Sequence, residues 1–217
     1  MSGQPGMAAD IGPDDAERDA ALLAALPHVP RLGWTIEAVR AGLVGSGGMA
    51  EDAAMLFPDG AGEVVEAFIT CADRWMAADA AAFDMTGLRT PGRVRAVIAL
   101  RLARLRPHRE AVRLAAGFLA LPAQSRRALR ITGRTVDTIW HAAGEALEDG
   151  SRLTKRPILA MVYASTLLVW LRDTTPDDTV TLAFLDRRLG DVGRIGKWRA
   201  AAEKKLGNIL CRKTSQA

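Results

Sequence analysis

The sequence predicts an all-α protein of about nine or ten helices. Apolar residues recur at helical spacing along most of the chain, and strand-like alternation of apolar and polar residues is scarce. The 217 residues are 49% apolar and 25% charged, which excludes a disordered chain and allows a sizeable buried core. The longest uncharged stretch near the carboxyl half, 158–171, is shorter than the roughly 20 residues that span a bilayer. We therefore interpret it as a buried core helix.

Capping and turn residues delimit the first helices. Pro13 fits the first position of an opening helix, and Pro27 ends it. Thr35 can cap a short helix that carries apolar residues at helical spacing, and the glycine-rich stretch 45–48 ends that helix. A short helical segment is expected next, over 50–57.

The later helices follow from apolar stripes. After a turn at 58–60, apolar residues from Val64 to Met76 keep helical spacing, and Thr90 with Pro91 opens a helix whose stripe ends at Leu105. The remaining expected helices are 109–120, 123–147, 154–172 and 177–200, the last opened by Thr175 as cap and Pro176 in the first turn.

The cysteines, the histidines and the amino terminus exclude several classes of protein. Cys71 and Cys211 lie far apart, so no disulfide framework is expected, and the three histidines lack the spacing of a zinc site. No basic residue precedes Arg18 and no apolar run precedes Ala20, so we expect neither a secretory signal nor a transit peptide. The sequence predicts a cytoplasmic protein with no metal and no other cofactor.

Charge is divided unequally along the chain. Residues 1–73 hold three basic and twelve acidic side chains, a net charge of −9, whereas residues 74–217 hold 26 basic and 13 acidic ones, a net charge of +13. Such an asymmetry favours a partner with a charged surface. We expect that partner to contact the second half.

Residues 14–60 have the layout of a helix-turn-helix unit, with a longer helix, a short helix, a turn and a second short helix. A DNA-reading version needs cationic or polar side chains at the start of the second short helix, because phosphate neutralisation supplies most of the affinity. That helix begins with Ala50, Glu51 and Asp52, and no Lys or Arg occurs between Arg40 and Arg74. We interpret the unit as a degenerate helix-turn-helix that packs on the rest of the chain and binds no nucleic acid.

Arginine dominates the middle of the chain. Twelve arginines lie in 89–134, where Glu110 is the only carboxylate. We expect Arg93, Arg101 and Arg104 to stand away from the apolar stripe of their helix. Two interpretations stay open: ordinary solvated helix faces, or a surface for lipid headgroups or an acidic protein partner.

The last segment pairs an apolar face with a basic one. This pattern is typical of an interfacial membrane helix, and also of an amphipathic helix packed on its own domain or on a twin subunit. The residues that we expect to contact a membrane are Ile195, Lys197, Trp198, Arg199, Lys204, Lys205, Leu206, Ile209 and Leu210.

Catalytic constellations are not recognisable in the sequence. Glu145, Glu148 and Asp149 are more typical of a helix end than of a catalytic pair. The glycine-rich stretch 45–48 lacks the preceding strand and following Lys of a phosphate loop. We interpret His141 as a hydrogen-bonded core or pocket histidine. Enzymatic activity is not expected. Large apolar side chains mixed with hydroxyls in 139–140 and 162–170 form either core or the lining of a lipid cavity.

Several short motifs carry a family resemblance. They are Gly33-Trp34-Thr35, Leu56-Phe57-Pro58, Trp140-His141-Ala142-Ala143-Gly144, Asp149, Thr154-Lys155-Arg156, Leu159-Ala160, Tyr163, Thr166, Pro176-Asp177 and Phe184-Leu185-Asp186-Arg187-Arg188. In this order and spacing, over about residues 17 to 200, the chain resembles the ubiquinone-biosynthesis lipid-binding accessory family. The resemblance implies a dimeric TetR-like fold without DNA recognition and a pocket for isoprenoid lipids. It also implies a terminal membrane helix and association with the di-iron demethoxyubiquinone hydroxylase.

The residue patterns and the family resemblance together predict four segments, a lipid-binding site and a partner-binding site. The segments are a flexible terminus 1–13, the helix-turn-helix-like unit 14–60, a ligand-binding bundle 61–193, and a basic amphipathic helix and tail 194–217. The expected lipid-binding residues are Leu102, Leu105, Leu114, Phe118, Ile139, Trp140, Val162, Tyr163, Thr166, Leu167 and Trp170. The expected partner-binding residues are Asp137, His141, Asp149, Arg152, Leu153, Lys155 and Arg156.

The chain departs from the family pattern in one loop. Between Asp149 and Thr154 the family has Phe-Asn-Trp-Tyr, whereas this chain has Gly150, Ser151, Arg152 and Leu153. Aromatic residues of that kind usually anchor interfaces. The hydroxylase contact is therefore either lost or rebuilt with charge.

We hypothesise a non-catalytic homodimer, peripheral to the inner (cytoplasmic) membrane. It binds an isoprenoid quinone intermediate or a phospholipid and presents the quinone to the hydroxylase. The alternative is a TetR-like transcriptional regulator that senses a small hydrophobic ligand. The net charge of −9 over residues 1–73 favours the first hypothesis.

Overall fold

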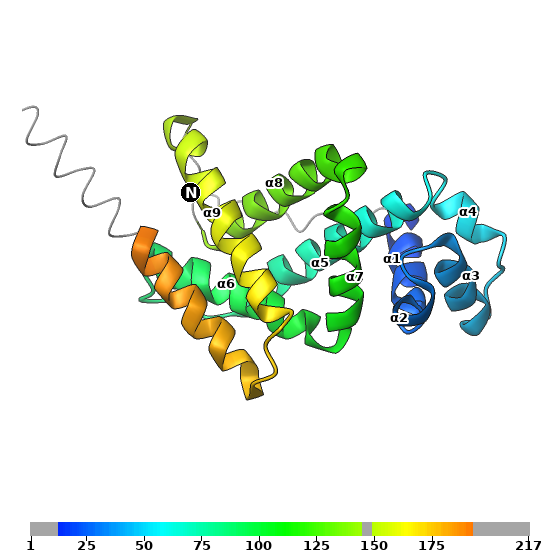
Figure 1. Cartoon of the computed structure of the whole chain (residues 1–217), viewed down its shortest axis with the longest axis horizontal. Helices are drawn as coiled ribbons and strands as arrows, with labels where there is room; N and C mark the ends of the chain where they lie inside the picture. The colour runs from blue at the N-terminus through cyan, green and yellow to red at the C-terminus, as the bar shows by residue number, and fades with distance from the viewer. Residues whose placement is uncertain (1–12, 145–148, 193–217) are drawn as a thin grey trace, which may run out of the picture.

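The computed structural model describes residues 13–144 and 149–192, and this part of the chain is all-α, as predicted (Figure 1). A further helical stretch covers 179–192. Short 3₁₀ turns lie at Arg106–His108, Pro122–Gln124 and Pro176–Asp178. The helices are α1 (Pro13–Ala25), α2 (Val29–Leu32), α3 (Ile36–Gly45), α4 (Asp52–Leu56), α5 (Ala61–Ala82), α6 (Thr90–Leu105), α7 (Arg109–Leu119), α8 (Ser125–Ala142) and α9 (Asp149–Trp170).

Two regions follow one another along the long axis of the molecule (Figure 1). Helices α1–α4, which we call the front end, occupy one end. Helices α5–α9 and the stretch 179–192, which we call the bundle, make up the rest. Helix α5 joins the regions, because it packs against α1 as well as against α6 and α8.

The front end is held by a helix cap, a tryptophan and a close helix crossing. Thr35 caps α3 as predicted, since its hydroxyl accepts a hydrogen bond from the Ala38 N–H at 3.2 Å. Trp34 is buried and donates its indole N–H to the Ala111 carbonyl oxygen at 2.8 Å, which ties the front end to α7. At Gly42 a Cβ would lie 2.5 Å from the backbone of Ala24, so only glycine lets α1 and α3 approach this closely.

Two helices differ from the sequence expectation. Helix α2 was not predicted, and Pro30 lies in its first turn, where the missing N–H costs no hydrogen bond. Helix α9 begins at Asp149 rather than near residue 154, so Pro157 lies inside it. The stretch 158–171 proves to be core only on one face, because Leu159 and Trp170 are buried while Met161 and Leu168 are exposed.

The main core lies where α5, α6, α8 and α9 meet. Its largest fully buried members in the bundle are Phe68, Met76, Ile98, Leu102, Ile139 and Trp170. Two cavities lie beside this core, and they carry the candidate site.

Candidate ligand cavities

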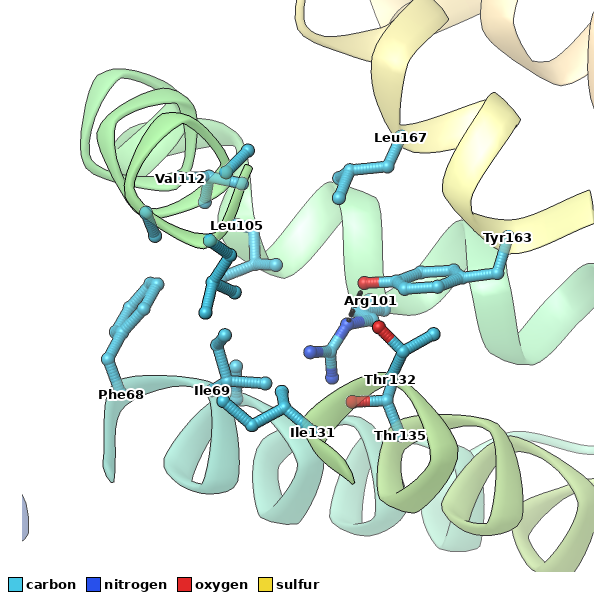
Figure 2. A pocket seen from close by; sticks show the side chains of 14 residues that line it. Phe68, Ile69, Arg101, Leu105, Val112, Ile131, Thr132, Thr135, Tyr163 and Leu167 are labelled. Carbon is cyan, nitrogen blue, oxygen red and sulfur yellow. Dashed lines mark hydrogen bonds between the residues drawn. The ribbon is translucent and has the colours of Figure 1, made fainter. Parts of the chain in front are cut away.

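Cavity A has a volume of about 90 Å³ and lies between α5, α6, α7, α8 and α9 (Figure 2). Its walls are mostly apolar, but one corner is polar. The lining residues are Phe68, Ile69, Ala72, Arg101, Leu105, Val112, Ala115, Ala116, Leu119, Ile131, Thr132, Thr135, Tyr163 and Leu167.

The polar corner of cavity A is built around a buried arginine. The Arg101 Nη1 atom lies 2.6 Å from the Asp73 carboxylate, and its Nε–H donates a hydrogen bond to the Tyr163 hydroxyl at 2.8 Å. Thr135 donates its hydroxyl to the same carboxylate at 3.0 Å. Side chains from α5, α6, α8 and α9 therefore form one connected polar chain. Figure 2 shows its Arg101–Tyr163 hydrogen bond.

The expectation that Arg101 stands away from the apolar stripe is wrong, because only 3% of it is exposed. A buried charge is tolerated when a counter-charge and further hydrogen bonds surround it. Here Asp73 and Tyr163 supply them from other helices. Burial raises the pKa of Asp73, while Arg101 and the Thr135 hydrogen bond oppose that rise.

Cavity B is larger, about 190 Å³, and almost wholly apolar. Lys155 is the one charged residue among those that line it. Cavity B extends to Val192, next to the segment that the sequence predicts to be a basic amphipathic helix. It is lined by Thr90, Pro91, Val94, Trp140, Lys155, Ile158, Leu159, Val162, Leu189 and Val192.

The structure divides the expected lipid-binding residues into three groups. Leu105, Tyr163 and Leu167 line cavity A, and Trp140 and Val162 line cavity B. The others pack in or against the core and line neither cavity: Leu102, Leu114, Phe118, Ile139, Thr166 and Trp170. Sequence reasoning missed Arg101, Thr132 and Thr135, whose place in cavity A depends on helices far away in the sequence.

Three of the expected partner-binding residues form one exposed cluster. Arg156 binds the Asp137 carboxylate at 2.7 Å. His141 Nδ1 lies 2.7 Å from the Asp137 carbonyl oxygen, one helical turn earlier. The interpretation of His141 as a core or pocket residue is wrong, because it is exposed on the outer face of α8. Lys155 is exposed and borders cavity B.

Other predicted residues lie where the structure gives no side-chain description. Helix α9 begins at Asp149, but the side chains of Asp149, Arg152 and Leu153 lie outside the described residues. The expected membrane-contacting residues Ile195, Lys197, Trp198, Arg199, Lys204, Lys205, Leu206, Ile209 and Leu210 also lie outside them.

Many of the arginines of 89–134 have carboxylate partners from outside that interval. Arg127, Arg130 and Arg134 on α8 converge on Glu66 of α5, with the shortest contact, 2.6 Å, from Arg130. Arg106 and Arg109 bind Asp178, and Arg95 binds Asp186. These ion pairs favour the interpretation of solvated, paired helix faces at the positions concerned.

No helix in the described part of the chain is long and apolar enough to cross a bilayer.

Comparisons with known proteins agree with the fold and identify the family. The structure superposes on a TetR transcriptional regulator from Nitrosomonas europaea with a TM-score of 0.65 and 24% identity, covering 81% of this chain and 97% of that one. The TetR-like fold is therefore confirmed.

Residues 125–196 match the COQ9 family model. The rat "Ubiquinone biosynthesis protein COQ9, mitochondrial" is 33% identical over 87% of this chain, and its human counterpart is 32% identical over 87%. The chain belongs to the COQ9 family.

Membership of the COQ9 family confirms the resemblance drawn from the short motifs. The chain spans 62% of the length of the rat relative and 61% of the human one. A relative from Dictyostelium discoideum, also named a probable mitochondrial ubiquinone biosynthesis protein, is 29% identical over 85% of this chain.

Proposed function

We propose that this chain is a non-catalytic, lipid-binding accessory protein of ubiquinone biosynthesis. It holds an isoprenoid quinone intermediate, or a phospholipid, and presents the quinone to a di-iron demethoxyubiquinone hydroxylase. The observation that carries the proposal is cavity B, an almost wholly apolar space of about 190 Å³ between α6, α8, α9 and the stretch 179–192. Its occurrence in a chain whose relatives are named ubiquinone biosynthesis proteins supports a quinone intermediate as the ligand.

The size and polarity of cavity B suit an isoprenoid tail. An apolar protein cavity of about 150 Å³ binds benzene, so cavity B has room for an isoprene unit. Each methylene removed from water contributes about 0.8 kcal/mol, so even a short part of the tail is held firmly. Lys155 at the lining places a cation where a polar headgroup emerges.

The predicted membrane contact and homodimer complete the proposal. Residues 195–210 carry basic side chains beside apolar ones, and each basic side chain near an anionic bilayer contributes about 1 kcal/mol to membrane binding.

On α9, Met161 and Leu168 are 70% and 60% exposed and lie on one face with Pro157 and Ala164. An apolar face of this kind supports packing against a second copy.

Cavity B is tested by filling it. Ile158→Trp adds bulk to the lining, and Met161→Trp places the same side chain on the exposed face of α9 as a matched control. We expect Ile158→Trp to reduce the polyprenyl quinone or phospholipid that co-purifies with the chain by about tenfold, and Met161→Trp to leave it unchanged. Native mass spectrometry measures the bound lipid. Equal lipid content in all three proteins would reject cavity B as the binding site.

Membrane and hydroxylase contacts are tested separately. Truncation after Gly193 should abolish flotation with anionic vesicles while the helical circular dichroism of the bundle persists. Lys155→Glu with Arg156→Glu should weaken capture of the purified hydroxylase, because these are two of the three cations, with Arg152, that the sequence offers to rebuild the contact. Unchanged capture would remove these residues from the partner surface.

A transcriptional regulator is the second candidate, favoured by the TetR-like fold alone. In the described structure α4, the second short helix of the front end, begins with Asp52 and follows Glu51. A mobility-shift assay at low salt with DNA from around the chain's own gene separates the two functions. We expect no sequence-selective shift; a salt-sensitive, selective one would favour the regulator.

A further inference from the structure

We infer that the polar corner of cavity A selects a ligand group with a neutral hydrogen-bond acceptor, such as the carbonyl or methoxy oxygen of a quinone. The inference rests on the proposed function, because it names the chemistry that distinguishes a quinone from a plain hydrocarbon. The central residue of this corner, Arg101, was expected from the sequence to lie on a solvated helix face. Figure 2 shows the guanidinium extending from α6 between Tyr163 and Ile131 toward the inside of the cavity.

The corner has more donors than acceptors. Arg101 carries five N–H groups, of which the contacts to Asp73, Tyr163 and, at 4.0 Å, the Met76 sulfur use at most three. Tyr163 accepts from Arg101 and so keeps its own O–H to donate. Among the residues that the structure describes, neither this hydroxyl nor that of Thr132 has an acceptor. Donors that line a mostly apolar cavity without an acceptor gain a hydrogen bond from a ligand oxygen placed here, and this raises the affinity for that ligand.

The charge of the corner determines which kind of acceptor it takes. Arg101 and Asp73 balance each other at 2.6 Å, and Thr135 hydrogen-bonds the same carboxylate. A carboxylate or phosphate would add an unbalanced negative charge next to Asp73, at a high desolvation cost. A carbonyl or ether oxygen accepts hydrogen bonds and adds no charge. The balance therefore favours a neutral oxygen over an anionic headgroup.

Volume and burial determine how much of the ligand enters. Arg101 and Thr135 are buried at the inner side of cavity A, whereas Ala116, Leu119 and Thr132 are partly exposed and mark its outer side. Because 90 Å³ is less than the roughly 150 Å³ of a cavity that takes benzene, cavity A admits an oxygen with a few carbons, such as one edge of a ring. The rest of the ligand lies outside.

The test compares two probes of the same shape. The quinone probe is 2-prenyl-1,4-benzoquinone and the hydrocarbon probe is prenylbenzene, and titration calorimetry on the full chain gives the dissociation constant of each. The preference is the ratio of the hydrocarbon constant to the quinone constant. We expect the wild-type chain to prefer the quinone by at least tenfold, the effect of about one hydrogen bond to a charged donor.

Variants then locate the source of the preference. Arg101→Met combined with Asp73→Leu replaces the buried ion pair by apolar groups, which proteins often tolerate, and should lower the preference about tenfold. Thr132→Val keeps the shape of the side chain, leaves the ion pair intact and should lower the preference two- to threefold. Arg104→Met, an exposed arginine of the same helix, is the matched control and should change nothing.

The outcomes separate this inference from the proposed function. If the wild-type chain binds both probes equally, or if the Thr132→Val chain keeps the full preference, the selective corner is rejected while the lipid cavity stands. Binding of neither probe also rejects the corner, and the lipid content of the Ile158→Trp chain then decides whether cavity B binds lipid at all.

Discussion

The front end and the bundle of this TetR-like fold differ in where they place charge. The front end has two short helices, α3 and α4, and the second of them opens with carboxylates at Glu51 and Asp52. The bundle keeps a buried cation, Arg101, beside a cavity. One end of the fold is therefore a closely packed set of short helices, whereas the other has polar side chains beside a cavity. The function follows from such a site and not from the fold alone.

Packing differs between the two regions as well. In the front end α1 and α3 approach so closely that Gly42 has no room for a Cβ, whereas in the bundle the meeting of five helices leaves cavity A. We therefore expect substitutions to act differently in the two regions. In the front end they change stability, and at the cavities they change binding.

The largest effect is expected at the tryptophan that joins the regions. Trp34→Ala removes a buried indole, its hydrogen bond to Ala111 and its contact with Phe68, whose ring centroid lies 4.6 Å away. We expect the free energy of unfolding in urea to fall by about 3–5 kcal/mol. Met55→Ala, at a side chain that is 78% exposed, is the control and should stay within about 0.5 kcal/mol. A separate, earlier transition in the wild-type chain would show instead that the front end unfolds independently of the bundle.

A smaller effect is expected at the helix crossing of the front end. Gly42→Ala puts a Cβ 2.5 Å from the Ala24 backbone, so α1 and α3 must move apart, and we expect a loss of about 1–3 kcal/mol. Gly45→Ala, in the same helix, meets no atom within 4 Å and should stabilise the chain by about 0.5–1 kcal/mol through helix propensity. Thermal unfolding of both variants measures the difference. Equal melting temperatures would mean that the crossing is not tightly packed.

Local signals predicted the helices well. The Thr35 cap and the starts at Pro13 and Thr90 depend on residues close in sequence, and the structure confirms all three. Helix α2 was missed because its four residues are too few for a periodic pattern, and α9 starts at Asp149, earlier than the expected residue 154. Short-range patterns thus located elements better than their exact ends.

The site was harder to predict because its residues meet only in three dimensions. Tyr163 and Leu167 were expected at a cavity from their apolar helix face, and they line cavity A. Arg101 looked like any other arginine of a basic stretch, because its partners lie 28 positions earlier, at Asp73, and 62 later, at Tyr163. A count of charges along the sequence cannot reveal such a pairing, and cavity volumes depend on packing that no single helix determines.

Acid titration should show how the bundle uses its buried carboxylates. Although burial opposes it, hydrogen bonds from Thr175 and Thr181 hold the pKa of Asp173 below its ordinary value. A carboxyl group with a lowered pKa in the folded state contributes stability above its unfolded pKa of about 3.9, and this is lost as the pH falls toward the folded pKa. Asp173→Asn should therefore cost about 1–3 kcal/mol at pH 7 and progressively less below pH 4. Urea unfolding from pH 7 to pH 3 measures this, and a pH-independent cost would contradict the role of the charge.

The smallest effect is expected at exposed ion pairs, where the two regions should behave alike. Arg95 and Asp186 join α6 to the stretch 179–192 at 2.5 Å, but their side chains are 40% and 50% exposed, and Arg40 and Glu37 form a comparable exposed pair in the front end. A double-mutant cycle with alanine at each pair should give a coupling free energy below about 1 kcal/mol, because water screens both charges. The coupling should fall further in 1 M salt, where the screening length is about 3 Å. A salt-resistant coupling of several kcal/mol between Arg95 and Asp186 would mean that the bundle excludes water and ions from this ion pair even at its surface. The contrast between the two regions would then extend beyond the cavities.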